Sequence, residues 1–67
     1  MRYFVNRNAQ DNGDHEVHEA TCSHLPAEDN RRDLGQFATC YAALREAKRH
    51  FPRSNGCFHC ARACHTA

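Results

Sequence analysis

Two cysteines separated by two residues, Cys57 and Cys60, set the strongest limit on how this chain folds. A tight turn between cysteines at this spacing brings two thiolates to one tetrahedral metal ion. The limit matters because the chain has only 67 residues, and a domain of that size buries only about 60% of its unfolded surface. Such small cores usually need a disulfide, a metal ion or a partner chain to be stable. We therefore predict one small domain over residues 1–67 that depends on a cross-link of this kind.

The choice between a metal and disulfides depends on the compartment. The first residues, 1–7, form no apolar export signal, and no stretch approaches the roughly 18 apolar residues of a transmembrane helix. We therefore expect a cytoplasmic protein that does not bind membranes, in which thiols stay reduced. The odd number of cysteines, five, also fits a closed disulfide framework poorly. The sequence thus favours a structural zinc ion over disulfides.

The other two zinc ligands are expected upstream, where His18 and Cys22 lie four residues apart. A chain that turns after Ala20 directs both side chains to one point, which completes a Cys3His site with Cys57 and Cys60. Cys40 is expected to pack in the core as a small apolar residue. Other residues remain alternative ligands: Cys64, His65 and His15.

The predicted fold is α+β, with an antiparallel β-hairpin at the N-terminus. Its strands are expected over residues 2–6 and 15–20, joined through Asn12-Gly13 by a two-residue turn or by four or five residues. Residues 24–33 have no periodicity and predict a surface loop. Residues 34–38 predict either a third strand or the first turn of the helix.

One α-helix is expected from Cys40 to about Phe51, with apolar or small residues recurring on one face. Thr39 is a candidate N-cap, and Pro52 stops the helix. A turn at residues 54–56 then leads into a C-terminal Cys-x-x-Cys knuckle. The sequence therefore predicts a hairpin or three-stranded sheet, one helix and this knuckle.

The motifs also resemble those of a family of short bacterial proteins that carries no assigned activity. The resemblance covers nearly the whole chain: His15-Glu16-Val17-His18-x3-Cys22, Leu34-Gly35-x-Phe37 and Asn55-Gly56-Cys57-x2-Cys60-x3-Cys64-His65-Thr66. More distantly, the order of elements is similar to the N-terminal zinc module of Ada-type DNA alkylation-repair proteins. That likeness implies ligands at His18, Cys22, Cys57 and Cys60. It also implies no methyl transfer, because His18 stands where the Ada-type module has its methyl-accepting cysteine.

No nucleophile–base pair or paired carboxylates stand out, so we predict a non-enzyme, with a protein-interaction module as the preferred function. An alternative is a nucleic-acid-binding accessory protein that contacts phosphates through the basic helix face: Arg45, Lys48, Arg49 and Arg53. Eight acidic residues and a pI near 7.7 argue against it, because nucleic-acid-binding domains typically exceed a pI of about 9. A third class, a redox- or metal-sensing thiol protein, requires Cys40 and Cys64 to be free.

Self-association is a further expectation, because a small core and exposed hairpin edges are relieved by a symmetric dimer. We predict a homodimer, with exchange of the N-terminal hairpin between two copies as one route.

Overall fold

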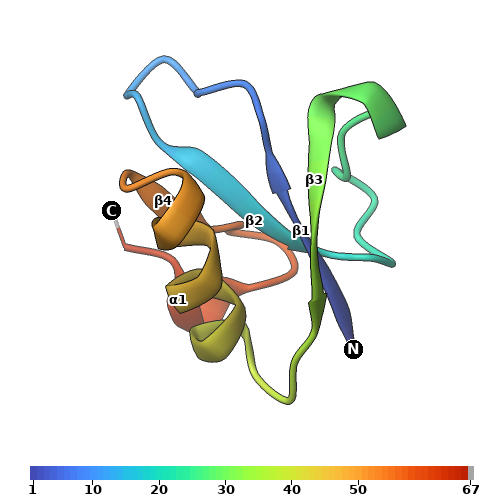
Figure 1. The fold of residues 1–67 in the computed structure, drawn as a ribbon. Coiled ribbons are helices and arrows are strands. Elements are labelled where there is room, and N and C mark those ends of the chain that lie inside the picture. Colours follow the sequence, from blue (N-terminus) through green and yellow to red (C-terminus); the bar gives the residue numbers. More distant parts are fainter. Residues whose placement is uncertain (67) are drawn as a thin grey trace.

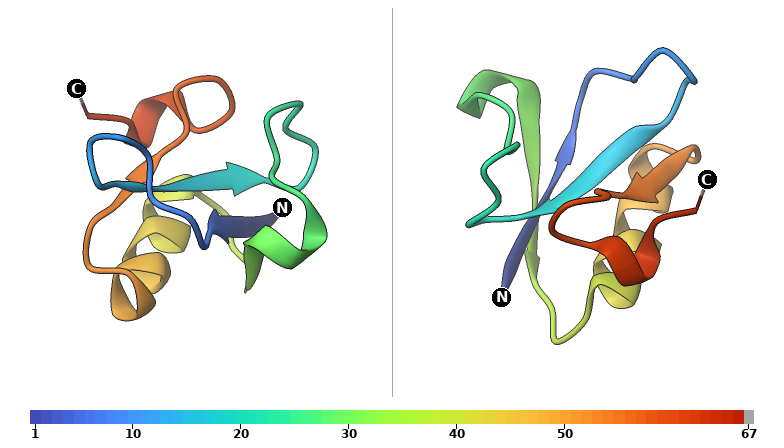
Figure 2. Two further views of the ribbon diagram at one scale, coloured as in Figure 1. Left: turned by 90° about the horizontal axis from the view of Figure 1, so that it is seen from above. Right: turned by 180° about the vertical axis from the view of Figure 1, so that it is seen from behind.

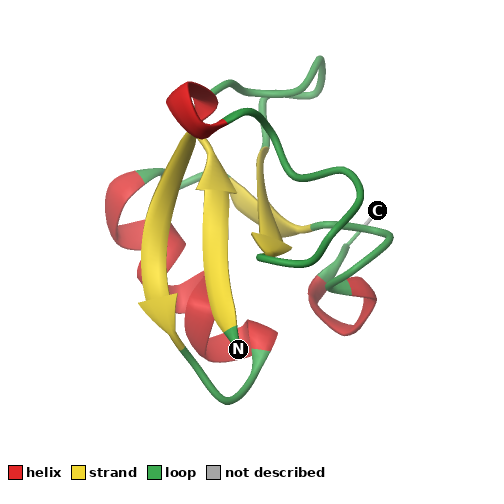
Figure 3. Ribbon diagram, turned by 90° about the vertical axis from the view of Figure 1, so that its right-hand side faces the viewer, coloured by secondary structure: helices red, strands yellow, loops and turns green. Residues whose placement is uncertain are grey.

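A mixed sheet of four strands and one α-helix make up residues 1–66, which the computed structural model describes (Figure 1). The α+β class predicted from the sequence is confirmed. The strands lie in the order β3-β1-β2-β4 (Figure 3), and only the β2–β4 pair is parallel. The elements are β1 (Arg2–Asn6), β2 (His15–Glu19), the 3-10 turn η1 (Glu28–Asn30), β3 (Arg31–Gln36), α1 (Cys40–His50), β4 (Ser54–Gly56) and the 3-10 turn η2 (Arg62–Cys64).

The predicted hairpin is confirmed, because β1 and β2 pair antiparallel with Val5 opposite Val17. The predicted length of its connection is wrong, because the two strands are joined by residues 7–14 and not by two to five residues. The tight turn forms only at the tip, where the backbone N–H of Gln10 donates to the carbonyl of Asp14 at 2.8 Å. Gly13 takes a φ of +90° there, which other residues adopt only with strain.

A third strand is also present, but β3 begins at Arg31, inside the segment predicted as a loop. It pairs antiparallel with β1, and the register shifts between Tyr3 and Phe4. Two N–H···O contacts of 2.8 Å join the guanidinium of Arg2 to the carboxylate of Asp33 across this pair. The loop prediction failed for residues 31–33 because such cross-strand partners carry no local sequence signal.

The helix begins as predicted, since the hydroxyl of Thr39 accepts the N–H of Ala42 at 3.3 Å. It lies on one side of β2, while residues 57–64 lie on the other side in the view from above in Figure 2. Successive strand residues point to opposite faces, so Val17 joins the core under the helix and His18 points away from it. That core comprises Tyr3, Val5, Val17, Leu34, Ala43 and Ala47.

The fourth strand was predicted only as a turn. Residues 54–56 instead pair parallel with β2, with Ser54 opposite His15 and Gly56 opposite Val17. The chain leaves this strand beside the end of β2, where the N–H of Cys57 donates to the carbonyl of Val17 at 2.9 Å. The short strand therefore places the Cys-x-x-Cys segment against His18.

Within residues 1–66, no helix combines the length and the apolar character that crossing a membrane requires.

Candidate metal centre

Four side chains from the two ends of the chain meet beside the C-terminal end of β2. The ring nitrogen of His18 and the sulfurs of Cys22, Cys57 and Cys60 all lie within 4.8 Å of one another. These are the four residues that the sequence predicted as a metal-binding set, and the structure brings all of them together. The cluster therefore could hold a metal ion.

The local backbone explains this convergence. A turn after β2, closed by a 3.0 Å bond from the N–H of Cys22 to the carbonyl of Glu19, carries Cys22 back toward the strand end. The N–H of Ala61 donates to the carbonyl of Cys57 at 2.9 Å, which closes the turn containing Cys60. His18 and Cys57 are each only 1% exposed, so the inner half of the cluster is closed to water.

The distances within the cluster are those of separate ligands. The sulfurs of Cys22 and Cys57 are 3.9 Å apart, and the sulfur of Cys60 is 4.0 Å from Nδ1 of His18. A disulfide needs about 2.05 Å, so these sulfurs are not bonded. Ligands placed tetrahedrally at a Zn–S distance of about 2.3 Å lie about 3.8 Å from one another. These two separations are close to this value, and every pair of ligand atoms lies within 4.8 Å.

Each sulfur of the cluster accepts a backbone N–H. The donors are Glu19 to Cys60 at 3.3 Å, His24 to Cys22 at 3.3 Å, and His59 to Cys57 at 3.4 Å. Such bonds stabilise the thiolate form, since a charged acceptor makes the stronger hydrogen bond. The backbone of both turns is therefore arranged for negatively charged sulfur.

The titration behaviour of the cluster follows from its burial. Burial raises the pKa of the Cys60 thiol far above its ordinary range, and the neighbouring Cys22 and Cys57 sulfurs add to this rise. The N–H of Glu19 acts in the opposite direction. Burial also lowers the pKa of His18, against a smaller upward effect of Glu16. His18 is therefore neutral near pH 7, which is the form that binds metals.

Glu16 supports the orientation of His18 from outside the cluster. Its carboxylate oxygen lies 3.6 Å from Nε2 of His18, while Nδ1 of the same ring faces Cys60. Carboxylates commonly orient metal-binding histidines in this way. The carboxylate favours a proton on Nε2, which leaves the lone pair of Nδ1 directed toward the three sulfurs.

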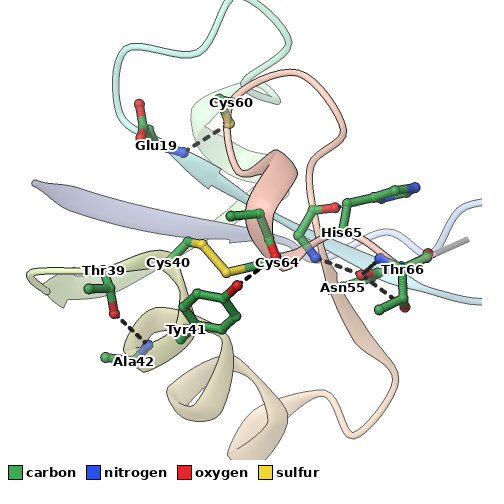
Figure 4. The surroundings of a disulfide bond; sticks show 12 residues. Glu19, Thr39, Cys40, Tyr41, Ala42, Asn55, Cys60, Cys64, His65 and Thr66 are labelled. Carbon is green, nitrogen blue, oxygen red and sulfur yellow. Dashed lines mark hydrogen bonds between the residues drawn. A yellow bond between two sulfur atoms is a disulfide. The ribbon is translucent and has the colours of Figure 1, made fainter.

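The structure corrects the predictions for Cys40 and Cys64. These cysteines form a disulfide, with Cα atoms 6.3 Å apart, between the start of α1 and η2 (Figure 4). Cys40 is thus not a free core residue, Cys64 is not a metal ligand, and the thiol-sensor hypothesis loses its two free thiols. The free cysteines of the described residues are the three in the cluster. The sequence favoured a metal over disulfides, but the structure contains a disulfide beside the cluster. Three cysteines converge on His18, and the other two pair with each other.

The alternative histidines lie outside the cluster. Nδ1 of His65 is 2.9 Å from the carbonyl oxygen of Gly56, and Nδ1 of His15 is 2.9 Å from that of Asn6. His15 also stacks on Phe51, with ring centroids 4.3 Å apart. Both histidines therefore serve in packing.

The basic residues of the helix region divide into two groups. Arg49 contacts the carboxylate of Glu46 at 3.1 Å, and Arg53 contacts that of Asp14 at 3.4 Å. Arg45 and Lys48 are exposed and make no ion pair with any carboxylate of residues 1–66. Two of the four predicted phosphate contacts are thus already paired within the chain.

Sequence reasoning missed the residues that hold the C-terminal segment in place. The buried Asn55 side chain donates to the carbonyl of Thr66 at 2.7 Å and accepts the N–H of Thr66 at 3.0 Å (Figure 4). A Cβ atom added to Gly56 would lie 2.7 Å from the carbonyl oxygen of Ala61 and 2.8 Å from Cβ of Cys64. The sequence predicts a turn at Asn55-Gly56, but in the structure these two residues pack β4 closely against the end of the chain.

No family model matches the chain, and no curated protein or solved structure is significantly similar to it. The resemblances drawn from its motifs therefore stay predictions, and a functional assignment depends on the geometry of the cluster.

Proposed function

We propose that this chain is a non-catalytic binding module whose fold is stabilised by one structural zinc ion on His18, Cys22, Cys57 and Cys60. The observation that carries the proposal is the convergence of four ligand atoms within 4.8 Å of one another, with the sulfurs of Cys22 and Cys57, 3.9 Å apart, close to the edge length of a tetrahedral zinc site. Zinc is favoured among common metals because thiolate and imidazole ligands in a tetrahedral arrangement suit it best.

A structural role is favoured over a catalytic one by the number of ligands. Catalytic zinc sites keep one position open for water or substrate, whereas structural sites use four protein ligands. The three N–H···S bonds further fix the sulfurs in place. The ion would tie the end of β2 to the segment after β4, two parts of the chain separated by 35 residues at Cys22 and Cys57. Zinc-binding energy of this kind is folding energy, on the order of 10 kcal/mol.

Native mass spectrometry tests the proposal on protein purified without chelator. We expect one zinc per chain in the wild type and a large loss of zinc in His18→Ala. His65→Ala is the matched control, because His65 lies on the same segment as Cys57 and Cys60 but contacts Gly56 rather than the cluster. A folded, metal-free wild type, or equal zinc retention in both variants, would contradict the proposal.

Two classes of partner suit such a module. The sequence favours a protein partner, and a nucleic acid is the alternative. The homodimer and the cytoplasmic location stay predictions. A monomeric mass at high protein concentration in the same spectra would rule out the homodimer.

A further inference from the structure

Large apolar side chains are exposed beside η2. Three such residues are exposed in residues 1–66, namely Met1, Tyr41 and Phe58, and the latter two flank this turn. The Tyr41 hydroxyl donates to the carbonyl of Ala63 at 2.9 Å, and the guanidinium of Arg62 lies 4.7 Å from the centre of the Phe58 ring. Tyr41 is 60% exposed and Phe58 is 46% exposed, so both rings offer surface to a ligand.

Further rings extend this surface across the cysteine-rich segment. Phe58 contacts His59 and His65 edge to face, with centroids 5.6 and 5.5 Å apart. His59 stacks on His24 at 3.9 Å. These contacts form a continuous group of rings on the outside of the metal cluster, which presents π faces and edges rather than aliphatic groups.

Basic residues predominate in the part of the chain that carries these rings. The sequence contains no acidic residue after Glu46 but four basic ones. Arg49 and Arg53 are paired with carboxylates, whereas Arg45, Lys48 and Arg62 make no ion pair with the described residues. Residues four and seven positions apart share one face of a helix, so Arg45 and Lys48 follow Tyr41 along the exposed side of α1.

We propose that this surface, formed by Tyr41, Phe58, Arg45, Lys48 and Arg62, binds single-stranded nucleic acid. Proteins that bind single strands combine aromatic platforms, on which bases stack, with basic side chains that follow the phosphates. Tyr41 and Phe58 supply the platforms, and the three unpaired basic residues supply the phosphate contacts. A duplex is a poorer ligand because its bases are already stacked on each other.

The inference rests on the proposed zinc module, because the cluster fixes the segment that carries Phe58, and the Cys40–Cys64 disulfide joins η2, which carries Arg62, to the start of α1. It differs from the basic helix face suggested by the sequence. That face included Arg49 and Arg53, which the structure pairs internally, and it lacked the aromatic residues and Arg62.

The test uses zinc-loaded protein with the disulfide intact and a fluorescein-labelled oligothymidine of about 12 nucleotides, within the site sizes known for single-strand binders, followed by fluorescence anisotropy. We expect salt-sensitive binding that is stronger than to a duplex of the same length. Tyr41→Ala and Phe58→Ala should each weaken it by about five- to 150-fold, the range for loss of a base-stacking ring. The triple variant Arg45→Gln/Lys48→Gln/Arg62→Gln should reduce the slope of log K against log salt by about 2. The matched control, Arg49→Gln/Arg53→Gln, should change the slope much less.

A second readout reports on the aromatic surface directly. The chain contains no tryptophan, so Phe58→Trp introduces a single indole fluorophore that a stacked base should quench. Zinc content, measured by mass spectrometry on every variant, separates this proposal from the previous one. A zinc-loaded chain that does not bind the oligonucleotide, or that binds it without quenching the introduced indole, overturns the nucleic-acid proposal and leaves the zinc module standing. A wild-type chain that mass spectrometry finds folded but free of zinc overturns the zinc module, whatever the binding assay shows.

Discussion

The disulfide between Cys40 and Cys64 joins the first residue of α1 to the last residue of η2. The same C-terminal segment carries Cys57 and Cys60 of the metal cluster. With zinc bound as proposed, residues 57–64 are fixed at one end to β2 by the metal and at the other end to the helix by the disulfide. Two different kinds of cross-link would then stabilise a core of few large residues.

Removal of the disulfide should lower the stability of the zinc-loaded chain. The bond closes a loop with a sequence separation of 24, for which chain entropy predicts a loss of about 3 kcal/mol in the free energy of unfolding. Cys40→Ala/Cys64→Ala is the suitable variant, because alanine keeps the Cβ of residue 64 that packs beside Gly56. Urea unfolding followed by circular dichroism measures the change. Equal midpoints for the two chains would show that the bond adds no stability.

Zinc should also determine which cysteines pair. With metal on three of the five cysteines, only Cys40 and Cys64 are available to form a disulfide. Reduced protein, oxidised by glutathione disulfide with zinc present, should yield this single bond. Metal-free protein should yield a mixture that includes Cys22–Cys57, whose sulfurs already lie 3.9 Å apart.

Peptide mapping after alkylation of the free thiols distinguishes these products. Zinc-loaded Cys40→Ala is the control, and it should form no intramolecular disulfide. The same mixture with and without zinc would contradict the idea that the metal protects the cluster.

The sequence was sufficient where local signals decide the structure. The helix has a capping threonine and a one-sided apolar pattern, and the hairpin has two β-prone runs around Asn12-Gly13. It was also sufficient to predict that His18, Cys22, Cys57 and Cys60 converge, because Cys-x-x-Cys and His-x3-Cys are close spacings that turns can satisfy. Their meeting at the end of β2 is the outcome that these spacings predict.

The sequence was insufficient where distant residues decide. Ser54-Asn55-Gly56 has little intrinsic β-propensity, and its strand exists because β2 offers a free edge and Asn55 is held by Thr66. The pairing of Cys40 with Cys64 depends on how α1 meets η2, which no local pattern shows. The prediction also assumed a cytoplasmic protein, in which cysteines usually stay reduced. This general rule led us to expect no disulfide, and it missed the pairing of Cys40 with Cys64.

Gly56 should be intolerant of a side chain. The Cβ of Gly56→Ala would overlap backbone atoms of Ala61 and Cys64, which cannot move without shifting the cysteine-rich segment. We expect a loss of about 1–3 kcal/mol, as for overpacked cores, and weaker zinc retention against a chelator. Gly13→Ala is the contrasting control. Its positive φ also causes strain, but the nearest atoms belong to the flexible end of Arg53. Gly13→Ala should therefore reduce stability without changing zinc retention.

Glu16 should strengthen zinc binding without touching the metal. Its carboxylate lies 3.6 Å from Nε2 of His18, on the far side of the ring from Cys60. Glu16→Gln keeps the size of the side chain but removes the charge that orients and polarises the imidazole. Loss of such outer partners typically lowers metal affinity about 10- to 100-fold, and the partial exposure of Glu16 favours the lower end, about 10-fold.

Competition with a chromogenic zinc chelator measures this affinity, and Glu19→Gln is the matched control. Glu19 follows His18 in the same strand. It contacts the cluster only through its backbone N–H, which donates to the sulfur of Cys60 and is left intact by the substitution. A drop confined to Glu16→Gln assigns the effect to the carboxylate beside His18. Equal drops in both variants would instead indicate a general effect of negative charge near the cation, and no change in either would show that burial alone orients the ring.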